Sequence, residues 1–335
     1  MTGPRVRVMW VITLAGMLLY GCTKVPVGPE SATWSPCNLG LGSLYVQCLA
    51  VDPHDENVIY AGTFGGLFRS VDAGRRWQAC GQGITSGDIS AIAVSPYRGD
   101  LLLCGTWGKG VFVSEDGGRT WLASSNGMRN PRVNAVAFDI EDSSRIYAAT
   151  TDAMFVSDDG GCSWQPCFPY GNVRSVAQHP LQAQVLYVGV EYHGLFKSED
   201  GGLTWQPKNS GLHRTEGSYD APRDIAFDPA EPRIMYAATG IIDLHKSEDG
   251  GETWKLQSDG LDWRRVRQVA VDRSDPRKVY AATDRGVMRS ADGGGKWYNM
   301  SEGLNSTNVR AIVVTKTTVY AGTYGGGVFR YAPKP

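Results

Sequence analysis

The sequence predicts an all-β fold, namely a closed β-propeller with seven blades of four antiparallel strands. The octapeptide SEDGGRTW at 114–121 recurs in close copies with a period of 41–49 residues, and regular repetition on this scale is typical of solenoids, arrays and propellers. Each period also contains four short β-branched and aromatic runs bounded by Gly, Pro and Asp, which is the pattern of a four-stranded antiparallel unit. Units of this size at this period are propeller blades.

The predicted strands follow the same order in every blade. An alternating apolar run such as VQCLAVDP comes first, and a run such as VIYAGT comes second. A third run, such as GLFRS, leads into the octapeptide, and a fourth begins at the octapeptide tryptophan, as in RWQAC. The seven predicted first strands are 46–53, 89–96, 133–140, 173–180, 222–229, 266–273 and 309–316.

The last repeat indicates how the ring closes. Seven first, second and third strands are present, but only six octapeptides are followed by a fourth strand, because the last repeat ends at GVFRYAPKP. The missing strand is at the other end of the chain, where TWSPC at 33–37 matches SWQPC at 163–167. We therefore expect residues 33–37 to pair beside the last third strand. This pairing closes the ring and removes two exposed strand edges.

The first residues predict export. Arg5 and Arg7 precede an apolar run of about 13 residues, which is shorter than the roughly 20 residues of a membrane-spanning helix and has the layout of a secretory signal. The run ends in LYGC at 19–22, which resembles the bacterial lipoprotein signal. That resemblance implies a signal peptide at 1–21, lipidation of Cys22 and an extracytoplasmic place in the cell envelope, at the outer membrane if the cell has one. An ordinary signal peptide or an uncleaved anchor is the alternative.

The rest of the chain divides into a tether and one domain. Residues 22–32 contain two prolines and a glycine and are predicted to be a flexible tether, so the propeller spans 33–335. Export permits disulfides, while burial as small apolar residues is the alternative for cysteines. The six cysteines after Cys22 are Cys37, Cys48, Cys80, Cys104, Cys162 and Cys167.

Composition and motifs exclude several classes of function. The net charge of −1 argues against nucleic acid as a partner. The five histidines have no paired-ligand spacing, and no glycine-rich phosphate loop opens a helix. We therefore expect no metal, no cofactor and a monomer.

The octapeptide resembles a known repeat. The pattern S-x-D-x-G-x-T-W is similar to the Asp-box, or BNR, repeat of sialidases, xyloglucanase-type glycoside hydrolases, sortilin-type receptors and photosystem II assembly-factor-like proteins. The resemblance covers nearly all of 33–332. It implies the propeller fold but no particular activity, because this fold carries many functions.

The octapeptide aspartates are predicted to be structural. A short acidic side chain there accepts hydrogen bonds from the following backbone N–H groups, and six copies spread around a ring cannot converge on one substrate. Each octapeptide also offers fewer carboxylates than a calcium loop needs. These aspartates are Asp72, Asp116, Asp159, Asp200, Asp249 and Asp292.

Two columns of the aligned repeats vary, and both are expected at the channel mouth. The column after the Y-A-x-T signature reads Phe64, Trp107, Thr151, Glu191, Gly240, Asp284 and Tyr324. Blades seven, one and two are neighbours in a closed ring, so Tyr324, Phe64 and Trp107 are predicted to form one aromatic arc. Glu191 and Asp284 are predicted to face it.

The second variable column is the second residue of the first strand. It reads Gln47, Ser90, Asn134, Arg174, Arg223, Arg267 and Arg310, with Arg264 and Arg265 nearby. Guanidinium groups at this density favour a carboxylate, a sulfate, a phosphate or an acidic segment of a partner protein. In the alternative interpretation, Glu191, Asp224 and Asp284 neutralise the arginines in a structural network.

Two functions remain open. A ligand- or protein-binding module, acting through the channel face of a lipid-anchored propeller, is the preferred prediction. A xyloglucanase- or sialidase-like glycosidase is the alternative, and Glu191 and Asp284 are then the candidate catalytic residues, because such enzymes need two carboxylates about 5–9.5 Å apart. The resemblance to xyloglucanases implies a catalytic aspartate directly after the first-blade threonine, where this chain has Phe64.

Overall fold

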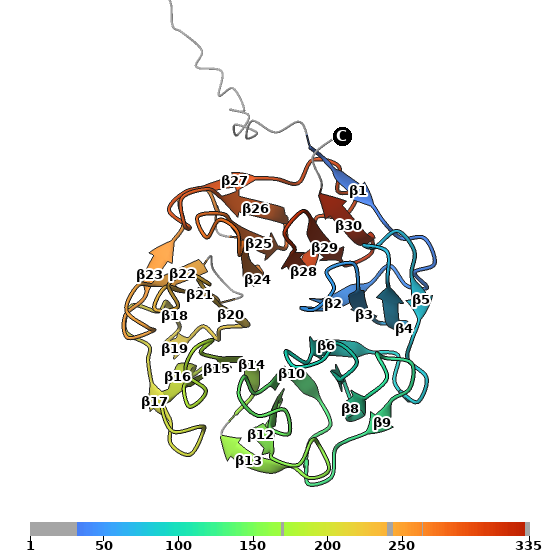
Figure 1. Cartoon of the computed structure of the whole chain (residues 1–335). Helices are drawn as coiled ribbons and strands as arrows, with labels where there is room; N and C mark the ends of the chain where they lie inside the picture. Colours follow the sequence, from blue (N-terminus) through green and yellow to red (C-terminus); the bar gives the residue numbers. More distant parts are fainter. Residues whose placement is uncertain (1–31, 169–170, 240–243, 263, 332–335) are drawn as a thin grey trace, which may run out of the picture.

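The computed structural model describes residues 32–168, 171–239, 244–262 and 264–331. Seven four-stranded antiparallel sheets surround a central channel (Figure 1). The first strand of each blade lies at the channel and the fourth at the rim. All regular elements of the described residues are strands, which confirms the predicted all-β propeller. Those residues include no helix of the length and apolar character that crossing a membrane requires. The predicted signal peptide and Cys22 lie outside them.

Six blades follow one another along the chain. Blades one to three are β2 (Val46–Val51), β3 (Ile59–Thr63), β4 (Gly66–Ser70), β5 (Gln78–Ala79); β6 (Ile89–Val94), β7 (Leu102–Thr106), β8 (Gly110–Ser114), β9 (Leu122–Ala123); and β10 (Val133–Phe138), β11 (Ile146–Thr150), β12 (Met154–Ser157), β13 (Gln165–Phe168). Blades four to six are β14 (Val173–Gln178), β15 (Leu186–Val190), β16 (Gly194–Ser198), β17 (Gln206–Pro207); β20 (Asp224–Phe227), β21 (Met235–Ala238), β22 (Leu244–Ser247), β23 (Lys255–Gln257); and β24 (Val266–Val271), β25 (Val279–Thr283), β26 (Gly286–Ser290), β27 (Trp297–Asn299).

The seventh blade combines both ends of the domain. It consists of β28 (Val309–Val314), β29 (Val319–Thr323), β30 (Gly327–Tyr331) and β1 (Trp34–Pro36). Trp34 pairs with Tyr331 and is 3% exposed, and its indole N–H donates to the Met300 carbonyl. The predicted closure is therefore confirmed, and Trp34 takes the place that an octapeptide tryptophan has in the other blades.

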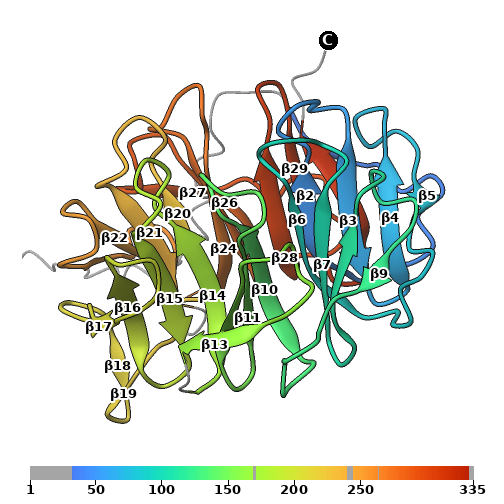
Figure 2. The same cartoon turned by 60° about the horizontal axis from the view of Figure 1, so that its bottom comes forward.

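A short hairpin between blades four and five was not anticipated from the sequence. It consists of β18 (Arg214–Thr215) and β19 (Ser218–Tyr219) and extends beyond β16 and β17 at the end of the blade where β15 turns into β16 (Figure 2). Tyr219 bridges to the backbone of Tyr192 and His193, so the hairpin rests on the turn between β15 and β16.

The hydrophobic core lies between blades rather than within them. The second strand of a blade is buried along its length, as in β3 and β7, because both of its faces are covered by neighbouring blades. One such cluster joins Tyr60 and Leu67 of blade one to Leu102, Phe112 and Trp121 of blade two. The six cysteines of the described residues are all free.

The octapeptide turns are held by their own side chains. In blade two, Ser114 donates to Asp116 Oδ1 at 2.9 Å, and Thr120 Oγ1 donates to Asp116 Oδ2 at 2.6 Å. Hydrogen bonds from Thr120 and Ser114 lower the pKa of Asp116 to about 2. The indole N–H of Trp121 then reaches the Cys80 carbonyl of blade one at 2.7 Å. Each turn therefore shapes its own blade and joins it to the preceding one.

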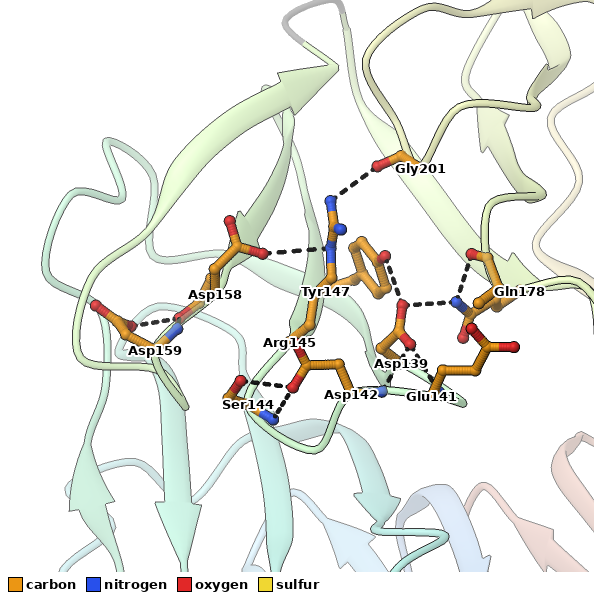
Figure 3. A network of polar contacts seen from close by, with 12 residues as sticks. Asp139, Glu141, Asp142, Ser144, Arg145, Tyr147, Asp158, Asp159, Gln178 and Gly201 are labelled. Carbon is orange, nitrogen blue, oxygen red and sulfur yellow. Dashed lines mark hydrogen bonds and ion pairs between the residues drawn. The ribbon is translucent and has the colours of Figure 1, made fainter.

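The interface of blades three and four carries a polar network at the octapeptide end (Figure 3). The Tyr147 hydroxyl and the Gln178 amide both donate to Asp139 Oδ2, at 3.0 and 2.7 Å. Arg145 Nη2 donates at 3.1 Å to the carbonyl of Gly201, which lies in the blade-four octapeptide. The bonds of Gln178 and Arg145 cross between blades three and four, whereas the Tyr147 bond lies within blade three. This end of the propeller therefore helps to hold the ring together.

Candidate ligand site in the central channel

A β-bulge sets the direction of one side chain in the first strand of most blades. The pairing of β2 with β3 shifts register between Val46 and Cys48, so Gln47 is the extra residue. The same shift recurs at the second position of β6, β10, β14, β24 and β28. A bulge frees a residue from the ladder and re-aims its side chain. Together with Arg223, directly before β20, the bulge residues line the central cavity: Gln47, Ser90, Asn134, Arg174, Arg267 and Arg310.

The cavity is strongly asymmetric. Its volume is about 530 Å³. The side chains that the first strands turn into it are neutral and polar in blades one to three and arginines in blades four to seven. Because Val46 pairs with Thr63, the ring of bulge residues lies at the end of the blades where Phe64 follows the second strand. The two variable columns therefore meet at one mouth of the channel.

Among the described residues, one channel arginine has a carboxylate partner. Arg174 Nη2 lies 2.6 Å from Glu191 Oε1, and Asn172 donates to the other oxygen of Glu191 at 2.7 Å. Across the described residues, no carboxylate oxygen lies within 4 Å of the guanidinium nitrogens of Arg223, Arg267 or Arg310, whereas several other arginines do form ion pairs. Direct pairing of the kind expected in a structural network is thus present at Arg174, while Glu191 and Asp284 act on Arg223 and Arg267 from a greater distance.

The channel arginines repel one another. Burial lowers the pKa of Arg223, and the nearby Arg174 and Arg267 lower it further. Burial and Arg310 likewise lower the pKa of Arg267. The Nε atoms of Arg267 and Arg310 are buried and have no hydrogen-bond partner among the described residues. An anion placed between these groups would relieve the repulsion and supply acceptors.

Aromatic rings gather at the same mouth. The rings of Phe64 and Tyr324 are 5.8 Å apart, and Tyr45 completes the group at 6.4 Å from Phe64 and 4.9 Å from Tyr324. Trp107 shares the cavity wall with Phe64. Arg310 Cζ lies 4.8 Å from the Tyr324 ring centroid, within cation–π distance. Tyr45 precedes the first strand and was missed in the sequence because that position lies outside both variable columns.

The two candidate catalytic carboxylates are both engaged by their surroundings. Glu191 is held by Arg174 and Asn172, and Asp284 Oδ1 accepts the backbone N–H of Arg265 at 3.1 Å. Neither is among the side chains that line the cavity. Arg264 donates to the Arg285 carbonyl at 2.7 Å and also lies outside the cavity wall. Gly240 of the first column lies outside the described residues.

Two other carboxylates do line the cavity. Burial raises the pKa of Asp224 to about 6 and also raises the pKa of Asp88. Asp224 Oδ2 accepts the backbone N–H of Val269 at 2.9 Å. Asp88 was missed because it precedes the first strand of blade two. As for metals, the described residues contain no group of three His, Cys, Asp or Glu side chains that could hold an ion.

No protein-family model and no curated protein matches the sequence, but solved structures do. The GH74 xyloglucanase from Xanthomonas campestris is 21% identical with a TM-score of 0.70, over 89% of this chain and 53% of that chain. YCF48 bound to D1 peptide is 17% identical with a TM-score of 0.71, over 93% of this chain and 100% of that one. A third structure is the extracellular domain of BT3049, a putative hybrid two-component system from B. thetaiotaomicron. It is 16% identical with a TM-score of 0.71, over 92% of this chain and 42% of that chain.

These similarities establish the fold. The chain spans 53% of the length of the Xanthomonas xyloglucanase and 46% of that of an ancestral GH74 enzyme, and the whole length of YCF48. The neighbours include GH74 enzymes, a peptide-bound protein and the extracellular domain of a putative two-component system, so the propeller is shared by proteins of different function.

Proposed function

We propose that this protein is a binding module that recognises an anionic ligand, or an acidic segment of a partner protein, at the mouth of its central channel. The observation that carries the proposal is the set of three channel arginines, Arg223, Arg267 and Arg310, without a carboxylate within 4 Å among the described residues. The adjoining rings of Phe64 and Tyr324 suit the apolar face of a sugar or a peptide side chain. YCF48, a neighbour of full matching length, has been solved with a peptide bound.

The test compares two channel variants with a matched control. Wild type, Arg267→Gln and Arg310→Gln are screened against an array of acidic and neutral glycans and in pull-downs from the native cell envelope. A charge-assisted hydrogen bond contributes about 1.5–3 kcal/mol, so each variant should weaken binding roughly tenfold or more. Arg98→Gln is the control, because Arg98 is exposed and has its own partner, Asp100, at 3.2 Å. Equal binding by all four proteins would contradict the proposal.

The glycosidase alternative is supported by the GH74 neighbours but less well by the site. Glu191 is paired with Arg174, Asp284 accepts the Arg265 backbone N–H, and neither lines the channel cavity. Hydrolysis of xyloglucan or a sialoside that is lost in Glu191→Gln or Asp284→Asn would favour the enzyme. We expect no turnover by the wild type.

We further propose that the propeller is exported and lipid-anchored through Cys22. The support is the LYGC sequence at 19–22 after a charged and apolar segment. Cys22→Ser should move the protein from the membrane fraction to the soluble fraction and abolish incorporation of labelled palmitate. Membrane association that persists unchanged in Cys22→Ser would contradict lipidation.

A further inference from the structure

A second basic site lies between blades one and two, at the octapeptide end of the propeller. A groove of about 330 Å³ is lined by Arg69 of β4, Arg76 of the blade-one octapeptide and Arg119 of the blade-two octapeptide. The amide side chains of Gln78 and Gln82 also line it. None of these residues lines the channel cavity, so this groove is separate from the channel site.

Arg69 is the fixed part of the groove. Its guanidinium lies 5.8 Å from the Tyr60 ring centroid, and its Nη2 lies 3.8 Å from the position a Cβ would take on Gly117. Its Nε is buried without a hydrogen-bond partner, and no carboxylate oxygen lies within 4 Å of it, in the part of the chain that the structure describes. The side chain is therefore held in place by packing and not by an opposite charge.

The same position is neutralised elsewhere in the ring. In blade four it is Lys197, whose Nζ lies 2.8 Å from Glu199 and 3.4 Å from Glu252 of blade five. In blade five it is Lys246, which pairs with Glu248 at 3.1 Å. In blades four and five, the basic residue of the third strand is therefore matched by octapeptide acids.

Between blades one and two, both of these acids have been replaced. Val71 stands where blade four has Glu199, and Arg119 stands where blade five has Glu252. Val71 is 61% exposed, so an acidic residue would fit at this position without disturbing the packing. Arg69 therefore lacks both of the acids that match Lys197.

The net charge of the groove is positive. Three arginines against Asp72 give +2, whereas the equivalent positions between blades four and five carry two lysines against Glu199, Asp200 and Glu252, which gives −1. Burial raises the pKa of the Cys80 thiol to about 12, so this thiol adds no negative charge. Asp72 Oδ1 is occupied by Ser70 and by the Arg76 backbone N–H.

We propose that the groove between blades one and two binds a phosphate monoester. Three guanidinium groups at one groove suit an oxyanion with three free oxygens, and Arg is the residue that binds such groups in a bidentate manner. A net charge of +2 matches the −1.5 to −2 of a phosphate monoester near pH 7. The groove is larger than one phosphate, and Gln78 and Gln82 offer hydrogen bonds to the hydroxyl groups of the esterified part.

Inorganic phosphate is the probe, titrated into the full chain by calorimetry at constant ionic strength. All proteins, the parent included, carry Arg267→Gln and Arg310→Gln, which weaken the channel site and leave its remaining contribution the same in each. Arg119→Glu recreates the Glu252 arrangement opposite Arg69, and Val71→Glu recreates Glu199. Both positions are exposed, so the fold should persist. Each should lower phosphate affinity at least about tenfold, because one charge-assisted bond is removed or one guanidinium is occupied.

Arg98→Gln in the same background is the control and should bind as the parent does. Absence of phosphate binding by the parent, or equal binding by parent, Arg119→Glu and Val71→Glu, would overturn the proposal. Displacement of phosphate by glucose 6-phosphate assigns a soluble ester as the natural ligand class, and displacement by vesicles containing phosphatidic acid assigns a lipid headgroup.

Discussion

Replacing Trp34 with Ala should break the closure of the ring. Trp34 is 3% exposed and packs in a cluster with Tyr280, Val287 and Phe329. Truncation of a buried aromatic side chain to Ala costs about 3–5 kcal/mol, and the lost indole N–H bond to the Met300 carbonyl adds about 1 kcal/mol. We therefore expect the free energy of unfolding to fall by about 4–6 kcal/mol, a large part of the stability of a typical domain.

Urea unfolding followed by circular dichroism measures this loss without depending on tryptophan fluorescence. Trp164→Ala in blade three is the internal standard, because Trp164 is equally buried and donates to the Ser124 carbonyl of the preceding blade at 2.9 Å. Ser35→Ala, in the same strand but exposed, is the control and should be nearly neutral. If Trp34→Ala behaved like Ser35→Ala, β1 would not be a structural part of blade seven.

Three further predictions concern backbone strain and pH. Gly303→Ala should cost clearly more stability than Gly66→Ala in thermal unfolding. Both glycines have positive φ, but only at Gly303 would a Cβ come close to the Trp34 carbonyl oxygen, at 2.3 Å. Equal losses in the two variants would contradict this. Asp224→Asn should raise the free energy of unfolding at pH 7–8 by on the order of 2 kcal/mol and leave it unchanged at pH 4. Burial raises the pKa of Asp224 to about 6 in the folded state, against about 4 in the unfolded state, so its charged form destabilises the fold. A loss of stability in Asp224→Asn at pH 8 would refute this. The octapeptide aspartates should act in the opposite sense, because the pKa of each is lower in the folded state than in the unfolded state. Their ionised carboxylates therefore stabilise the fold above about pH 4, and this stabilisation is lost as the pH falls towards about 2. Unfolding measured along an acid titration detects the loss. The pKa is lowered to about 2 in Asp116, Asp159 and Asp200.

The fold was predictable because the same local interactions recur in successive repeats. Three features each have a fixed sequence signature: the turn whose backbone N–H groups bond the octapeptide aspartate, the tryptophan that contacts the preceding blade, and the buried second strand. Even the exchange of strands at the closure followed from a missing copy, and Trp34 opposite Tyr331 matches that expectation.

The site was only partly predictable, because its geometry depends on deviations from the repeat. The arginine column could be read from aligned sequences, but the bulges that turn Gln47 and its equivalents into the channel leave no signature in residue type. The pairing of Arg174 with Glu191 and the absence of such a pair at Arg310 depend on side-chain distances between blades. Asp88 and Tyr45 lie just outside the repeated strands, where alignment gives no register.

The closing strand has a consequence for the order in which the protein can fold. β1 is synthesised first and its partner β30 last, so contacts such as that between Cys37 and the Val328 carbonyl span 291 residues of chain. Non-local contacts of this kind form slowly, because loop closure must precede them. Blades one to six can pair their strands as they emerge, but Trp34 must wait, exposed, until Tyr331 has been made. The ring is therefore completed only after synthesis of the domain. Until β1 pairs with β30, the open edges of these two strands are exposed to wrong partners.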